Sequence, residues 1–244
     1  MKKILLTILL GAASVSVFSQ DKPAAAPAST NSGKETRVSL VFSPNMTWNR
    51  ATSEKGVENE TYKTSGVGVR YRTGINVDFH FGQNASFTTG LFYLVKRANF
   101  QVNSGTKDTT LGGDYKYNLQ YLQVPLTLKM FTNNIADDFK LYFQLGPTLD
   151  FKINEKRVEG DVSTLEAKNV FLFFDAGLMA GAGVEWQLGS STAAFFGLSY
   201  NRSLLNGINP LIKYNKIPSN QDPKLVNHLN MKTDFISLDL GVKF

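Results

Sequence analysis

The residues best suited to covalent chemistry lie near the end of the chain. His228 stands in the polar stretch 204–232, and Ser203, Ser219 or Asp222 could accompany it. A serine activated by a histidine can hydrolyse or transfer acyl groups. Nothing in the sequence fixes the geometry that such a site requires. A solvated loop histidine is therefore the simpler interpretation of His228, and we expect no catalytic residue.

The composition also argues against metal and cofactor chemistry. The chain has no cysteine and two histidines, which excludes a disulfide framework and a thiolate metal site. The 26 basic and 20 acidic residues give a net charge of +6, or +4 (24 minus 20) without Lys2 and Lys3. Because this excess is mild and scattered, it does not indicate nucleic-acid binding. We expect no metal, no cofactor and no nucleic acid.

Charged side chains of both signs recur at alternate positions inside apolar segments. They are Arg70, Arg72, Asp78, Lys140, Asp150, Lys152, Asp175, Glu185 and Asp239. If these side chains share an enclosed space, they should form a structural ion-pair network, because an unpaired buried charge is costly. A proton or ion path through Arg70, Asp78, Asp150 and Glu185 is the alternative.

The segment FFDAGLMAGAGVEWQLG (173–189) indicates which element positions these charges. Its even positions from Phe174 to Trp186 are all apolar, whereas its odd positions are small or polar apart from one methionine. Successive side chains of a strand point to opposite faces, so this period of two predicts a strand. On this interpretation, the strand has Gly177, Gly181 and Gly183 because small residues fit a tight interior.

Eight segments show this alternation, less clearly in the third. They are 36–48, 66–81, 85–98, 121–131, 139–153, 174–186, 193–201 and 234–244. In the fourth, the apolar residues move from odd positions (Leu119, Tyr121) to even positions near Leu122. Such a change of phase predicts a β-bulge.

Alternation also occurs in soluble barrels that keep their apolar face inside, but two features indicate lipid outside. Aromatic residues stand near the ends of the apolar faces, as in a membrane girdle: Trp48, Tyr71, Phe81, Phe139, Phe151, Phe174, Trp186, Phe196, Tyr200 and Phe244. The connections alternate between long (50–65, 101–114, 155–169 and 204–232) and short (82–84, 132–138 and 189–191). Outer-membrane barrels have long extracellular loops and short periplasmic turns.

The predicted fold is therefore all-β, an eight-stranded antiparallel transmembrane up-and-down β-barrel over residues 36–244. Both termini are expected in the periplasm of a bacterium, with the barrel in its outer membrane. Eight strands leave room mainly for side chains, so we expect no open pore. Residues 1–19 have the basic start, apolar run and small residues of a signal peptide. Residues 20–35, rich in Pro, Ala and Ser, are expected to form a flexible periplasmic segment.

The long stretch 204–232 is basic and carries apolar residues, which makes it a candidate contact surface. The residues concerned are Lys213, Tyr214, Lys216, Ile217, Lys224 and His228. Such a loop could bind a partner protein or anionic outer-leaflet lipid. An ordinary solvated loop is the alternative.

Four segments, YLQVPLTLKMF, LYFQLGPTLDFKI, FDAGLMAGAGVEW and FISLDLGVKF, resemble the PorT-like outer-membrane β-barrel family in order and spacing. The resemblance covers roughly residues 36–244 and implies a structural or partner-binding barrel associated with type IX protein secretion. Secretion-machinery proteins and outer-membrane lipid are the implied partners, and no catalytic residue is carried over. The alternative is an enzyme that modifies outer-membrane lipid, as a lipid A or phospholipid hydrolase or acyltransferase. The sequence does not specify an oligomeric state.

Overall fold

A computed structural model describes residues 36–53, 60–64, 66–82, 84–104, 113–135, 138–159, 170–209 and 229–244. The predicted signal peptide and the segment 20–35 lie outside the described residues. The strands are β1 (Thr36–Ser53), β2 (Glu60–Thr64), β3 (Gly68–His80), β4 (Ala85–Ser104), β5 (Gly113–Phe131), β6 (Phe139–Glu159), β7 (Phe174–Gln187), β8 (Ala193–Ser203) and β9 (Leu229–Lys243). No helix in these ranges is long and apolar enough to cross a membrane.

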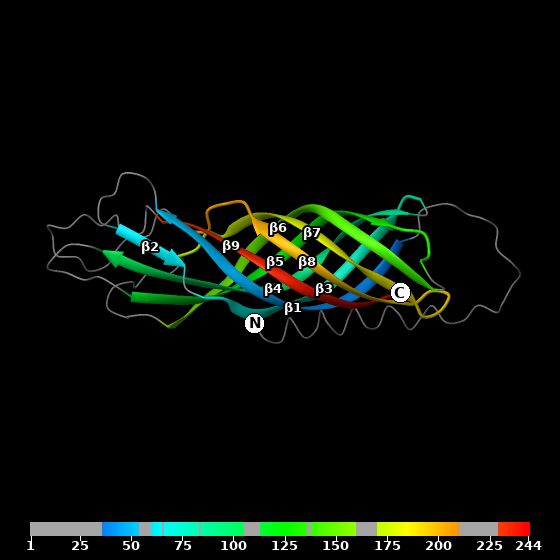
Figure 1. Cartoon of the computed structure of the whole chain (residues 1–244), viewed down its shortest axis with the longest axis horizontal. Coiled ribbons are helices and arrows are strands. Elements are labelled where there is room, and N and C mark those ends of the chain that lie inside the picture. The colour runs from blue at the N-terminus through cyan, green and yellow to red at the C-terminus, as the bar shows by residue number, and fades with distance from the viewer. Residues whose placement is uncertain are drawn as a thin grey trace, which may run out of the picture. The chain divides into compact units, whose positions relative to one another are not determined.

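Eight of these strands form a closed antiparallel barrel, as predicted. Going round the wall, the order is β3, β1, β9, β8, β7, β6, β5 and β4, and β4 pairs with β3 to complete the circle. The strands run obliquely (Figure 1), as closure of a sheet into a barrel requires. Closure also gives each strand two neighbours, so no strand forms a free edge of the wall along its whole length.

The two ends of the barrel differ in their connections. At one end, called the short-turn end, residues 81–84, 132–138 and 188–192 link β3 to β4, β5 to β6 and β7 to β8. The first and last barrel strands meet there too, because the amides and carbonyls of Val38 and Phe244 exchange hydrogen bonds of 3.3 and 2.8 Å. The opposite end, called the long-connection end, carries the four longer links.

Strands continue into the stretches that were predicted to be polar loops. β2 lies within the predicted loop 50–65 and pairs with β4 from Phe100 to Ser104, at the long-connection end (Figure 1). β6 likewise runs on to Glu159. Backbone pairing continues past the apolar zone because a ladder of hydrogen bonds does not itself need an alternating sequence.

The side chains have the orientation predicted for lipid outside. Phe42 on β1 and Leu198 on β8 are 51% and 54% exposed, whereas their neighbours Ser43 and Ser199 are buried. The same alternation runs along the whole of β8. The wall therefore presents apolar side chains outward and polar side chains to the interior.

The predicted change of phase in β5 has another origin. Tyr117, Leu119 and Tyr121 are buried, whereas Leu128 and Met130 are exposed, so odd positions face inward along the described length of β5. Register shifts between β5 and β6 do occur next to the predicted position, but the extra residues belong to β6. The sequence suggested a switch because the interior itself becomes apolar at this level.

Glycines on β7 and β8 make room for an interior side chain, as predicted for β7. Gly183 and Gly197 face each other across the ladder. A Cβ at either position would lie 2.5 or 2.2 Å from the hydroxyl oxygen of Tyr142, which is itself buried. The absence of two side chains therefore creates the space that the Tyr142 ring fills.

Side chains replace backbone pairing along part of the wall. The β3–β4 ladder ends at Arg72 and Leu94. Beyond it, β1 side chains reach β4: Thr47 Oγ1 accepts from the Arg97 amide (3.3 Å) and donates to the Gly68 carbonyl (2.9 Å). Asn49 donates to the carbonyls of Arg97 and Asn99. We call this contact between β1 and β4 the side-chain seam.

Candidate functional site

The barrel interior holds the candidate site, and its first layer lies toward the short-turn end. Lys243 Nζ lies 2.9 Å from Asp78 and 2.5 Å from Glu185. Lys129 Nζ lies 3.7 Å from Asp78 and 4.2 Å from the centre of the Tyr142 ring. All four charged side chains are buried. Two cations thus face two anions, and an aromatic face adds a cation–π contact.

The second layer joins this end of the interior to the middle. Arg72 pairs with Asp239 at 2.8 Å and stacks 4.5 Å from the centre of the Phe92 ring. Arg72 also donates to Gln123 Oε1 (3.2 Å), and Gln123 Nε2 donates to Asp150 Oδ1 (2.8 Å). The amide of Gln123 therefore connects one ion pair to the next.

The third layer places one cation between two acids. Lys96 Nζ lies 2.6 Å from Asp150 and 3.2 Å from Asp175, which are direct partners across the β6–β7 ladder. Ser203 Oγ donates to Asp175 Oδ1 at 2.9 Å. Lys96 also lies 5.0 Å from the centre of the Tyr121 ring. The paired charges and the ring contact compensate for desolvation of the ammonium group.

An apolar cap fills the interior at the long-connection end. Its members come from three strands, β4, β5 and β9, and from two inward-folded segments: Leu94, Ala98, Phe100, Tyr117, Leu119, Tyr121, Val170, Phe171, Ile208, Met231 and Phe235. Phe171 and Ile208 form a β-bridge, and Glu155 accepts hydrogen bonds from the amides of Val170 (2.9 Å) and Phe171 (3.2 Å). Lys152 donates to Glu155 and to the Phe171 carbonyl. These bonds hold the segment 170–171 across the barrel.

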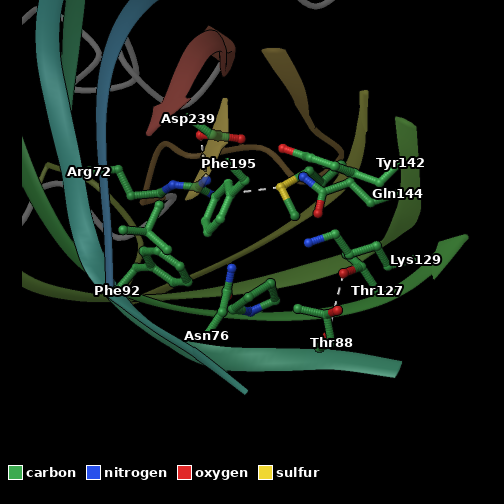
Figure 2. A pocket seen from close by; sticks show the side chains of 13 residues that line it. Arg72, Asn76, Thr88, Phe92, Thr127, Lys129, Tyr142, Gln144, Phe195 and Asp239 are labelled. Carbon is green, nitrogen blue, oxygen red and sulfur yellow. Dashed lines mark hydrogen bonds and ion pairs between the residues drawn. The ribbon is translucent and has the colours of Figure 1, made fainter. Parts of the chain in front are cut away.

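A small cavity lies between the first two layers (Figure 2). Its volume is about 10 Å³, which is about enough for one water molecule. Figure 2 shows Arg72, Asp239, Lys129 and Tyr142 converging on it from different parts of the wall. The described interior therefore contains packed ion pairs and rings at every level, and this cavity is too small to conduct hydrated ions.

Six of the nine predicted interior charges lie together in the three layers: Arg72, Asp78, Asp150, Asp175, Glu185 and Asp239. The other three lie elsewhere. Arg70 hydrogen-bonds to Asn118 at 2.6 Å, and Lys152 pairs with Glu155 beneath the apolar cap. Lys140 is exposed at the start of β6. Arg70 and Lys140 lie near strand ends, where alternation continues but the wall no longer encloses the side chain. Lys152 does face the interior and its side chain is largely buried, but next to the cap and outside the three layers.

Three buried cations, Lys96, Lys129 and Lys243, were not among the predicted interior charges. Lys129 alternates with the exposed Leu128 and Met130, and Lys243 shares a face with Asp239, so both carried the period-two signal. Lys96 did not, because its inward neighbours Leu94 and Ala98 are apolar too. Among the described residues, no group of three His, Asp or Glu side chains is placed to hold a metal ion.

The ten predicted girdle aromatics follow the outward-facing positions of their strands. Phe139 stacks on Trp186 (5.5 Å) near the short-turn end, and Phe151 packs on Phe174 (5.4 Å) toward the other end. The twelve residue-to-residue steps from Phe139 to Phe151 span about 40 Å along the strand, or about 30 Å along the barrel axis when the strand is tilted by about 40°. That spacing matches the thickness of a bilayer's hydrocarbon core. The predicted loop surface from Lys213 to His228 lies outside the described residues.

A match to a protein family agrees with this architecture. A family described as outer membrane protein beta-barrel domain matches residues 18–209. Neisserial surface protein A is 13% identical, with 86% of this chain and 97% of that chain covered and a TM-score of 0.45. OprG from Pseudomonas aeruginosa is 14% identical, with 85% and 95% covered and a TM-score of 0.47. None of the curated proteins compared with the chain matches it.

Proposed function

We propose that this chain, which belongs to the outer membrane protein beta-barrel domain family, is a non-conducting barrel that anchors a binding surface in the bacterial outer membrane. The observation that carries the proposal is the filled interior. Three layers of buried ion pairs and the apolar cap follow one another between the two ends. A solute would have to break paired buried charges at each layer, which is strongly unfavourable.

The binding surface of this proposal is the long-connection end, facing outward from the cell, with both termini in the periplasm. Long loops on a rigid scaffold are where barrels and other folds carry their contacts. By its resemblance to PorT-like proteins, the chain would contact secretion-machinery proteins and assist export. The bilayer lipid itself would be its other partner.

The role that we propose is not catalytic. Ser203, which the sequence offered as a nucleophile, is buried and donates its hydroxyl hydrogen to Asp175. Asp175 is engaged in turn by Lys96 at 3.2 Å. A nucleophilic serine needs a free base beside it and access for a substrate, and the surroundings of Ser203 favour a structural role.

Conductance measurements test the closed interior. The full chain, refolded into planar bilayers, should give no single-channel steps above the bare bilayer. A heat-dependent shift of the folded protein on a gel provides the control that the inserted chain is a barrel. Reproducible steps from the folded protein would overturn the proposal.

The secretion role needs a separate experiment. A strain that lacks the protein should release fewer exported proteins into the medium, and the wild-type gene should restore their export. Unchanged export in that strain would refute the secretion role and leave the non-conducting anchor standing.

A further inference from the structure

We propose that the outer wall of β1, β8 and β9 binds the phosphate headgroup of a membrane lipid through Arg50, Arg202 and Lys232, here named the basic cluster. The inference goes beyond the anchor function and depends on the family's location in a membrane. It does not depend on the secretion role. It is argued from the position of these three side chains, from the contacts that hold Arg50 in place, and from the charge of the cluster.

The basic cluster lies on the outer face, directly beyond an aromatic pair. Trp48 stacks on Tyr200 at 5.9 Å. Arg50 follows Trp48 by two residues and is the direct ladder partner of Lys232, so both share the outward face of the wall. Arg202 follows Tyr200 by two residues and is exposed. Aromatic side chains mark the level of lipid headgroups, which places these cations at that level.

Arg50 is held in place before any ligand arrives. Its Nε and Nη2 donate to the two carboxylate oxygens of Asp234 at 2.7 and 2.9 Å, and Nη2 also donates to the Ser203 carbonyl at 2.8 Å. Tyr200 donates its hydroxyl hydrogen to the same carboxylate (3.2 Å). The Asp234 side chain is 1% exposed, whereas that of Arg50 remains 36% exposed. The bidentate pair therefore fixes a guanidinium group that still faces outward.

Within the described parts of β1, β8 and β9, the charge of the cluster is not balanced. Arg50 and Lys232 stand directly opposite each other, which is unfavourable for like charges on one face of a sheet. In the described parts of β1, β8 and β9, Asp234 is the only acidic residue on the outer face. Three cations against one anion leave a charge of +2. An anionic group would remove this repulsion.

The wall beneath the cluster is suited to acyl chains. From the aromatic pair toward the short-turn end, the same strands expose Met46, Leu198 and Ile236. A ligand that meets both regions carries a negative head above an apolar body. A phospholipid or another phosphate-bearing lipid has this form, and free phosphate has only the head. We therefore commit to a lipid as the occupant.

Native mass spectrometry of the folded full chain tests the site, with phosphatidylglycerol and phosphatidylcholine as probes. The wild type should retain phosphatidylglycerol preferentially. The variant R202Q/K232Q keeps the Arg50–Asp234 pair but removes two cations, so its affinity for phosphatidylglycerol should fall about tenfold or more. The matched control K140Q/K156Q removes the same charge from two exposed lysines of β6 and should bind as the wild type does.

Three outcomes would overturn the inference. They are equal retention of both lipids by the wild type, equal losses in the two variants, and displacement of phosphatidylglycerol by inorganic phosphate. If R202Q/K232Q does not fold, photo-crosslinking of wild type with a photoactivatable phosphatidylglycerol decides the matter. Labelling should then fall on residues 46–53, 198–204 or 229–236, and labelling confined to strands other than β1, β8 and β9 would refute the site.

Discussion

Lys243 is the residue on which the first interior layer depends. It is completely buried and contacts both Asp78 and Glu185. Replacement by Met would keep most of the volume and leave two carboxylates facing one remaining cation, Lys129. Breaking a buried pair from one side costs about 3–5 kcal/mol.

The variant Lys243→Met should therefore lower the free energy of unfolding in vesicles by about that amount, as measured by urea titration. The exposed Lys140 provides the control, because Lys140→Met removes the same charge outside the interior. Equal stabilities for the two variants would contradict the structural role of the first layer.

A second prediction about a single residue concerns Gly197, which leaves space for the Tyr142 ring. A Cβ at this position would lie 2.2 Å from the Tyr142 hydroxyl oxygen. Gly197→Ala should destabilise the barrel by about 1–3 kcal/mol, because an overpacked interior must shift its side chains or backbone.

The double variant G197A/Y142F should recover part of that loss, since it deletes the clashing oxygen. Comparison of the unfolding free energies of both single variants and the double variant measures the coupling. Strictly additive effects would mean that the glycine serves some purpose other than making room for Tyr142.

At the scale of elements, the side-chain seam is the part of the described wall where side chains take the place of the β3–β4 ladder. Thr47 there bonds to both the Arg97 amide and the Gly68 carbonyl. Thr47→Val preserves the shape and removes the hydroxyl group, so the Arg97 amide should exchange its hydrogen faster, because its bonded partner is lost.

Hydrogen exchange read by NMR or mass spectrometry checks this expectation. Thr73→Val is the matched control: Thr73 also bonds to a carbonyl, that of Val41 at 3.1 Å, but it lies where the β3–β4 ladder is intact. Protection at Arg97 that stays unchanged in Thr47→Val would show that the seam is held by packing alone.

At the scale of the whole molecule, the decisive property is which face of the wall meets lipid. The chain has no cysteine, so single cysteines can be placed at will. A spin label at Leu198 should be accessible to oxygen dissolved in the bilayer, whereas one at the adjacent Ser199 should be shielded, because these side chains lie on opposite faces. Equal accessibility, or the reverse order, would contradict the barrel's orientation in the membrane.

Much of the fold follows from local sequence. The period of two identified all eight barrel strands and their outward face, and short and long connections identified the two ends. These properties depend on the geometry of one strand and on the lipid or interior that each face meets, so adjacent residues carry the information. Of the two glycines that make room for Tyr142, Gly183 was predicted for the same reason to lie in a tight interior.

Only the tertiary structure decided which charges meet and what closes the long-connection end. Arg72 and Asp239 are 167 positions apart, and their contact depends on the tilt and register of all the strands between them. Lys96 was not predicted because its inward-facing neighbours along β4, Leu94 and Ala98, are apolar. The apolar cap likewise gave β5 a pattern that looked like a change of phase. The alternating pattern predicts that a side chain faces inward. Its position along the barrel axis, however, is set by the stagger of the strands in the closed sheet.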